Sequence, residues 1–210
     1  MRARTLGICM PMLMLMATAG CASSGSRFTR PQPETLVLGK TTHDEVVRQV
    51  GEPVRTGTGV KNDQPLKVVG YWYYCGLACK LGEERDWTGK FYGRAMHFFF
   101  SDDVLVGYDY TSTHDTDDTD FDDTKAYQLK KGQTTRSQVI ELLGKPSGMY
   151  IYPMISSKTD TALVYVYQGT KHKPRFPRGL ETEHTSKFLV VSFDTQDLLT
   201  GAEFGPGGER

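Results

Sequence analysis

The chain has 210 residues, and its 25 lysines and arginines balance 25 aspartates and glutamates. This zero net charge excludes a global field that would recruit nucleic acid or an anionic surface. With 38% hydrophobic and 24% charged residues, the composition is typical of a soluble globular chain that is long enough for one or two compact domains.

The N-terminal segment has the layout of a secretory signal and is predicted to lie outside the fold. Two arginines precede an apolar stretch over residues 6–17, which is too short to span a bilayer. The sequence Thr-Ala-Gly-Cys that ends at Cys21 resembles the lipobox of bacterial lipoproteins, although leucine is more usual where Thr18 stands. Residues 1–20 are therefore predicted to be a lipoprotein signal peptide, with Cys21 as the acylated first residue of the mature protein. Cleavage after Ala19, which would give a soluble periplasmic protein, is the alternative.

A flexible tether is predicted over residues 21–35. This segment is small, polar and punctuated by prolines, with too little apolar surface to fold. Because Ala22 follows the cysteine, where an aspartate would signal inner-membrane retention, the lipobox resemblance implies sorting to the outer membrane. The protein would then be lipid-anchored there and face the periplasm.

The first predicted unit, residues 36–112, opens on a short capped helix. Thr42 stands three residues before Glu45, which is the capping-box pattern at a helix start. Three valines at helical spacing follow, and Gly51 and Pro53 end the helix. A helix of eight or nine residues is too short to be stable alone in water, so it is expected to pack on the sheet formed by the strands that follow.

Two cysteines follow the first strand of this unit in the sequence CGLAC. In the periplasm, a pair as close as Cys75 and Cys79 predicts a disulfide, which would contribute about 2 kcal/mol on the chain-entropy model. Free or redox-active thiols and a zinc site with His97 or another of the five histidines are the alternatives. Zinc usually requires a second closely spaced pair of ligands, and the sequence offers none, so no metal is predicted.

An acidic segment separates the two predicted units over residues 113–126. It carries six aspartates, but it lacks the central glycine and terminal glutamate of a calcium-binding EF-hand loop. A solvated linker is therefore predicted, with calcium binding as the alternative.

Residues 127–204 repeat the first unit. Thr135 and Gln138 form a second capping-box pattern, 93 residues after the first, and the same offset relates Tyr74 to Tyr167. A constant offset over about 70 residues indicates a tandem duplication. The predicted fold class is α+β, with two tandem units that each pack short helices on a three-stranded antiparallel sheet.

These repeated residues resemble the SmpA/OmlA outer-membrane lipoprotein family, to which the small E lipoprotein of the β-barrel assembly machinery belongs. The tandem arrangement is similar to that of the β-lactamase inhibitory protein, which is built from two such units. The resemblance covers residues 36–204 and implies the fold class above, with a role in outer-membrane protein assembly or envelope integrity. The matching positions are Gly39, Thr41, Thr42, Gly51, Pro53, Trp72, Tyr74 and Phe100, then Gly132, Thr134, Thr135, Gly144, Pro146, Tyr165, Tyr167 and Phe193.

Alternation along the first strand of each unit predicts which side chains are available to a partner. One set is expected to face the helices: Val69, Tyr71 and Tyr73, with Ala162, Val164 and Val166. The other set is expected on the far face, where tandem relatives present a concave binding surface: Trp72, Tyr74, Tyr165 and Tyr167. These aromatic side chains suit a partner-binding surface. The alternative is that they close a second small core.

A basic segment lies in the second unit, within the sequence KHKPRFPR. Lys171, Lys173, Arg175 and Arg178 are predicted to contact anionic lipid or lipopolysaccharide, at about 1 kcal/mol per charge. The alternative is an exposed loop with no specific partner. Residues 205–210 are predicted to be a disordered tail.

Known catalytic motifs and phosphate-binding glycine loops are not found in the sequence, and neither an enzyme nor a cofactor is predicted. The predicted function is that of a lipoprotein that binds or scaffolds one or more envelope proteins, without nucleic acid. The alternatives are an inhibitor or sequestering partner of a periplasmic or secreted enzyme, and adhesion to lipopolysaccharide or peptidoglycan. The sequence does not predict the oligomeric state.

Overall fold

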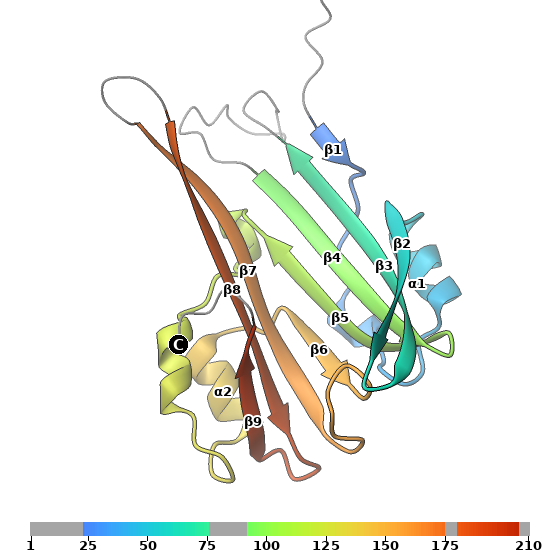
Figure 1. Cartoon of the computed structure of the whole chain (residues 1–210), viewed down its shortest axis with the longest axis vertical. Helices are drawn as coiled ribbons and strands as arrows, with labels where there is room; N and C mark the ends of the chain where they lie inside the picture. Colours follow the sequence, from blue (N-terminus) through green and yellow to red (C-terminus); the bar gives the residue numbers. More distant parts are fainter. Residues whose placement is uncertain (1–22, 76–91, 175–179, 206–210) are drawn as a thin grey trace, which may run out of the picture.

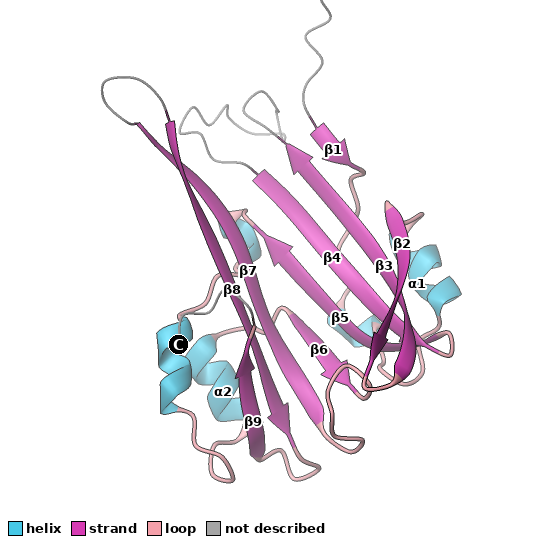
Figure 2. Cartoon of the chain, in the orientation of Figure 1, coloured by secondary structure: helices cyan, strands magenta, loops and turns pink. Residues whose placement is uncertain are grey.

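The computed structural model describes residues 23–75, 92–174 and 180–205. Its strands form one nine-stranded antiparallel sheet in the order β1-β3-β4-β5-β6-β7-β8-β9, with β2 also paired to β3 (Figure 1). The strands are β1 (Ser23–Gly25), β2 (Arg55–Lys61), β3 (Gln64–Cys75), β4 (Tyr92–Ser101), β5 (Val104–Ser112), β6 (Gly148–Ile151), β7 (Thr161–Pro174), β8 (Leu180–Phe193) and β9 (Leu199–Phe204). The α-helices are α1 (His43–Val50) and α2 (Arg136–Leu143), and short 3-10 helices are η1 (Pro33–Thr35), η2 (Asp115–Asp117) and η3 (Asp123–Gln128) (Figure 2).

The prediction of two separate helix-and-sheet units is wrong, because the sheet is continuous. Strand β6 pairs on one side with β7 and on the other with β5, where Tyr150 lies opposite Gly107 and Met149 opposite Tyr108. The backbone ladder therefore passes from the first half of the chain to the second. Strand β6 has four residues, too few for a periodic pattern to reveal it.

Both capped helices form where the sequence predicts them. The side chains of Thr42 and Thr135 accept hydrogen bonds from the backbone amides of Glu45 and Gln138, whose side chains accept in return from the two threonine amides. The glycine that follows each helix has a positive φ, 98° after α1 and 86° after α2, and such residues commonly end helices.

Both helices lie on the same face of the sheet, called here the helix face. Val46 of α1 packs in a cluster with Tyr71, and Val139 of α2 packs in a second cluster with Tyr165. Met149 of β6 contacts both clusters. Both valines are 0% exposed, which stabilises each helix on the sheet by about 1.5–3 kcal/mol. The opposite face, called here the open face, is not covered by any helix of the described residues.

The second half reverses the predicted orientation of its first long strand. Tyr165 is 1% exposed and lies on the helix face, where Tyr167 also packs, whereas Ala162 and Val164 belong to a cluster on the open face. The prediction that Tyr165 and Tyr167 share a face with Trp72 is therefore wrong.

The reason is one additional residue between the second helix and its strand. The hydroxyl of Tyr71 donates to the carbonyl of Gly51 at 2.9 Å, and that of Tyr165 donates to the carbonyl of Gly144 at 3.1 Å. The two glycines are 93 residues apart, but the two tyrosines are 94 apart. A shift of one residue moves every side chain of a strand to the other face.

The predicted tether is ordered against the domain from Ser23 onward. Strand β1 pairs with the end of β3, with Ser23 opposite Cys75, and Phe28 packs against the helix-face cluster of α1. The guanidinium of Arg30 lies 4.2 Å from the ring centroid of Tyr110. Strand β2 pairs only with residues 64–70 of β3, so the end of the same edge is available to β1. Backbone pairing with β3 therefore orders this segment although its side chains are mostly polar.

The acidic segment is attached to both halves. Arg94 Nε lies 2.6 Å from an Asp117 carboxylate oxygen, and Lys187 Nζ lies 2.8 Å from an Asp120 oxygen. Phe121 is 6% exposed and packs in the cluster of α2. The segment is therefore not a solvated linker along its whole length.

Candidate functional site

The open face gathers aromatic and titratable side chains from four neighbouring strands. The open-face cluster consists of Trp72 on β3, His97 and Phe99 on β4, Asp109 on β5 and Tyr150 on β6. The sheet register brings them together, because His97 lies opposite Asp109, and Gly107 lies between Phe99 and Tyr150.

A hydrogen-bond network joins three members of this cluster. His97 Nδ1 lies 2.9 Å from one carboxylate oxygen of Asp109, and the Tyr150 hydroxyl donates to the other at 2.6 Å. Because an ionised carboxylate only accepts, Nδ1 of His97 carries a proton. The Asp109 side chain is 10% exposed and that of His97 is 42% exposed. The imidazole is therefore the part of this network that a partner can reach.

The network changes the pKa values of His97 and Tyr150. The hydrogen bond to Asp109 raises the pKa of His97 above its ordinary value, and burial, which acts in the opposite direction, does not cancel this effect. Burial and then the Asp109 carboxylate raise the pKa of Tyr150, so its hydroxyl stays protonated. Of the three side chains in this network, His97 is consequently the one whose charge changes closest to neutral pH.

The aromatic members form the surface around this network. The rings of Phe99 and Tyr150 meet edge to face, with centroids 5.6 Å apart. A Cβ atom at Gly70 would lie 3.2 Å from the Trp72 ring and 3.7 Å from the His97 ring, so the glycine leaves space for the indole beside the imidazole. Aromatic groups with polar tips on a sheet face are typical of protein-binding hot spots.

An aspartate that orients a histidine is also found in catalytic triads, where the histidine activates a serine or cysteine. In the described part of the chain, His97 forms no hydrogen bond with a serine, threonine or cysteine side chain. The same residues contain no group of three or more histidine, cysteine, aspartate or glutamate side chains placed to hold a metal ion.

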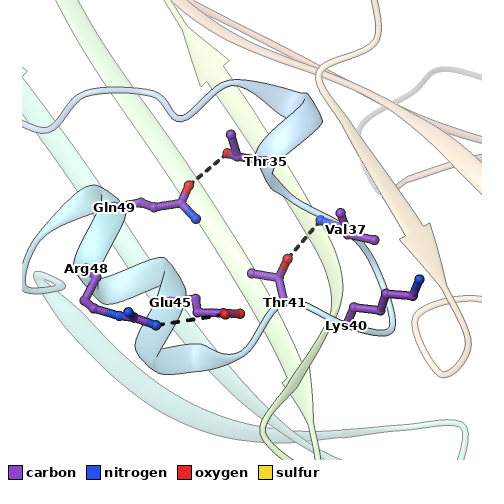
Figure 3. Close-up of a pocket in the computed structure, with 7 residues that line it drawn as sticks. All are labelled: Thr35, Val37, Lys40, Thr41, Glu45, Arg48 and Gln49. Carbon is purple, nitrogen blue, oxygen red and sulfur yellow. Dashed lines mark hydrogen bonds and ion pairs between the residues drawn. The ribbon is translucent and has the colours of Figure 1, made fainter.

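A groove of about 510 Å³ lies beside α1, away from this cluster (Figure 3). Its polar groups bond to one another, as in the 2.8 Å hydrogen bond from Thr35 to Gln49 and the 3.9 Å ion pair of Arg48 with Glu45. A similar groove beside α2 has leucine and glutamate where this one has Gln49 and Arg48. The two grooves share a threonine, Thr41 or Thr134, whose hydroxyl accepts from the backbone amide four residues earlier, and a capping residue, Glu45 or Gln138. We attribute both grooves to the packing of the helices.

Two of the four predicted partner-binding residues lie on the face that carries this cluster, and their role stays a prediction. Trp72 and Tyr74 lie on the open face as predicted, with Tyr74 40% exposed. The prediction named His97 only as a possible zinc ligand, and it did not name Asp109 or Tyr150. His97 alternates with buried apolar neighbours along its strand, a signal for the open face, but its pairing with Asp109 depends on a register that the sequence does not show.

The remaining predicted residues lie at or beyond the limits of the described structure. Cys21, Cys79, Arg175 and Arg178 lie outside the described residues, so lipidation and the disulfide stay predictions. Cys75 is buried at the end of β3. Two further basic residues, Lys171 and Lys173, lie in β7 in register with Glu183 and Glu181. The predicted contact of these residues with anionic lipid stays a prediction.

Comparisons with known proteins leave the family of this chain open. No family model matches the chain, and no curated protein matches it. Among solved structures, it is similar to the crystal structure of a candidate beta-lactamase inhibitor protein from Streptococcus mutans, with 13% identity and a TM-score of 0.39. The alignment covers 81% of this chain and 85% of that one. At this level of similarity, the comparison supports no statement about what the chain binds.

Proposed function

We propose that this protein binds one or more envelope proteins through the open-face cluster, without catalysing a reaction. The observation that carries the proposal is the set of partly exposed Trp72, His97 and Phe99 side chains on a sheet face that no described helix covers. Burial of these rings by a partner would release water from apolar surface, while His97 would supply a polar contact at the centre.

We also propose that a lipid on Cys21 anchors the protein at the outer membrane. Strand β1 begins at Ser23, so Ala22 alone would separate the acylated residue from the ordered domain. The chain from Cys21 to Ser23 spans at most about 7 Å, so the domain would lie directly at the bilayer surface. No helix of the described residues is long and apolar enough to cross a membrane. Mass spectrometry of the mature N-terminus tests this anchor, since an acylated Cys21 supports it and an unmodified Gly20 or Cys21 contradicts it.

Photo-crosslinking in intact cells tests the binding surface. A photoreactive residue would replace Trp72 on the open face in one strain and Val37, which is 46% exposed beside α1, in a control strain. We expect a discrete crosslinked product at position 72 and none of the same mass at position 37. Equal crosslinking at both positions, or none at position 72, would contradict the proposal.

Identification of the crosslinked protein separates two roles for the same surface. Subunits of the barrel-assembly machinery or nascent outer-membrane proteins would indicate an accessory role in assembly. A single enzyme captured in equimolar amount would instead indicate an inhibitor or sequestering protein. The proposed surface is the same in both cases.

A further inference from the structure

The last strand of the sheet repeats the geometry of a strand at its centre. In β5, Gly107 lies opposite Phe99 and Leu105 lies opposite Phe100, with a bulge between the two pairs. In β9, Gly201 lies opposite Ser192 and Leu199 lies opposite Phe193, with a bulge at the same place. Strand β9 is therefore the counterpart of β5, and each of its residues stands 94 positions after its equivalent.

The two strands differ in what lies on their outer edges. The outer edge of β5 pairs with β6 and is buried, with Tyr110 2% and Asp109 7% exposed. The backbone of Leu199 at the start of β9 bonds to Gly132 and Thr134. Beyond Leu199, no strand of the described residues pairs with the outer edge of β9, and its Phe204, the equivalent of Tyr110, is 37% exposed. An unpaired edge presents backbone donors and acceptors that an added strand can pair with.

The pairing of β6 with β5 shows how a side chain of an added strand packs at such an edge. A Cβ atom at Gly107 would lie 2.6 Å from the ring of Tyr150, so this position needs glycine for the ring to lie over it. The Tyr150 hydroxyl then donates to Asp109. In β9, the equivalents of Gly107 and Asp109 are Gly201 and Glu203. A Cβ atom at Gly201 would have no neighbour within 4 Å among the described residues. Glu203 supplies a carboxylate in place of that of Asp109.

A cavity lies at this empty position. Its volume is about 300 Å³, and Gly201, Glu203, Met154 and Ile155 are among the residues that line it. Met154 also lies beside the Tyr150 ring, because its Cγ would be 3.1 Å from a Cβ atom at Gly107. The cavity thus provides a glycine floor, a carboxylate and two apolar side chains, which are elements that also surround Tyr150 in the first half. The rest of its lining is polar or charged and includes Lys61, Asn62 and Asp160.

We propose that the edge of β9 from Gly201 to Phe204 is an acceptor site for an extended strand of a partner protein that carries a tyrosine. The strand adds to the sheet as β6 adds to β5. Its tyrosine ring lies over Gly201, and its hydroxyl donates to Glu203. Main-chain pairing supplies affinity, and the tyrosine supplies specificity, as in other cases of strand addition. This edge site is separate from the open-face cluster on β3–β6.

A labelled peptide with the sequence KPSGMYIYP, which corresponds to residues 145–153, is the probe for this site. Binding to the mature protein would be followed by fluorescence anisotropy. We expect saturable binding that Gly201→Val weakens at least tenfold, because the valine side chain occupies the place of the ring. Gly57→Val on β2 is the matched control, since it adds the same side chain in open space at the opposite edge of the sheet and is expected to leave binding unchanged.

The tyrosine contact is tested by a double-mutant cycle. Glu203→Gln and replacement by phenylalanine of the peptide tyrosine that corresponds to Tyr150 are each expected to weaken binding about threefold to tenfold, on the order of the net contribution of one hydrogen bond. The two changes together should weaken it no further than either alone. Additive effects, or binding that Gly201→Val does not change, would overturn the proposal. Self-association of the chain through this edge without peptide binding would also overturn it. Neither result affects the test at Trp72.

Discussion

The two halves of the sheet agree on the helix face and differ on the open face. On the helix face, Tyr71 and Tyr165 make the same hydrogen bond to the end of a helix. On the open face, His97 of the first half is matched by Val190 of the second, since both lie opposite the acidic residue of the following strand. The helix face thus has the same packing contact in both halves. On the open face, only the first half has a titratable histidine opposite the acidic residue.

The largest expected effect concerns Tyr165. Because this side chain is 1% exposed, Tyr165→Ala should lower the free energy of unfolding by about 3–5 kcal/mol, the usual cost of removing a large buried side chain. Trp72→Ala, at a partly exposed position on the open face, should cost only about 1–2 kcal/mol. Urea denaturation measures both. Equal costs for the two variants would mean that the faces are assigned incorrectly.

The attachment of the acidic segment gives the next effect. Burial alone would raise the pKa of Asp117, but hydrogen bonds from Arg94, Ser112 and Tyr110 outweigh it and lower the pKa to about 2. Asp117→Ala should therefore cost about 2 kcal/mol. Asp120→Ala should cost less than about 1 kcal/mol, because Asp120 forms a more exposed ion pair with Lys187.

The sign of the pH dependence follows from the lowered pKa. Asp117 contributes stability at pH values above its ordinary pKa of 3.8, and this contribution is lost as the pH falls from about 4 towards about 2. Unfolding measured across this range should show a smaller loss of stability in Asp117→Ala than in the wild type. An identical acid dependence in both proteins would contradict the assignment.

The helix caps should respond equally. Thr42→Ala and Thr135→Ala each remove one capping hydrogen bond and should each cost about 1 kcal/mol in thermal or urea unfolding. Thr56→Ala on the exposed strand β2 serves as the control. A cost at one cap and none at the other would show that the two halves do not use the helix in the same way.

The smallest effect is a titration. Because the hydrogen bond to Asp109 raises the pKa of His97, Asp109→Asn should lower that pKa, as followed by the imidazole signals in NMR. In the wild type, this pair contributes stability fully below the ordinary histidine pKa of 6.5, and the contribution is lost as the pH rises through the raised value. An unchanged His97 titration in the variant would contradict the network.

Some elements of the fold could be predicted because their signals are local. The capping boxes and the glycines after each helix lie within a few residues of each other, and α1 and α2 form where they are expected. The continuous sheet could not be predicted, because it depends on β6 and on its pairing with Gly107. The reversed position of Tyr165 has a similar origin, since a single additional residue between repeats inverts a strand without changing its composition.

Only part of the candidate site could be predicted from the sequence, for the same reason. Trp72 could be assigned to the open face by counting from the helix-facing residues of its own strand. Asp109 and Tyr150 come to His97 from strands β5 and β6 through the sheet register, and no short motif encodes that register.

The affinity of this protein for the partner that crosslinks at position 72 tests the central claim most directly. Its dissociation constant would be measured for the wild type and for the double variant Trp72→Ala/His97→Ala, after denaturation has shown that the variant is folded. The account predicts binding at least tenfold weaker in the variant, which corresponds to about 1.4 kcal/mol. An unchanged dissociation constant would show that the open face is not the binding surface.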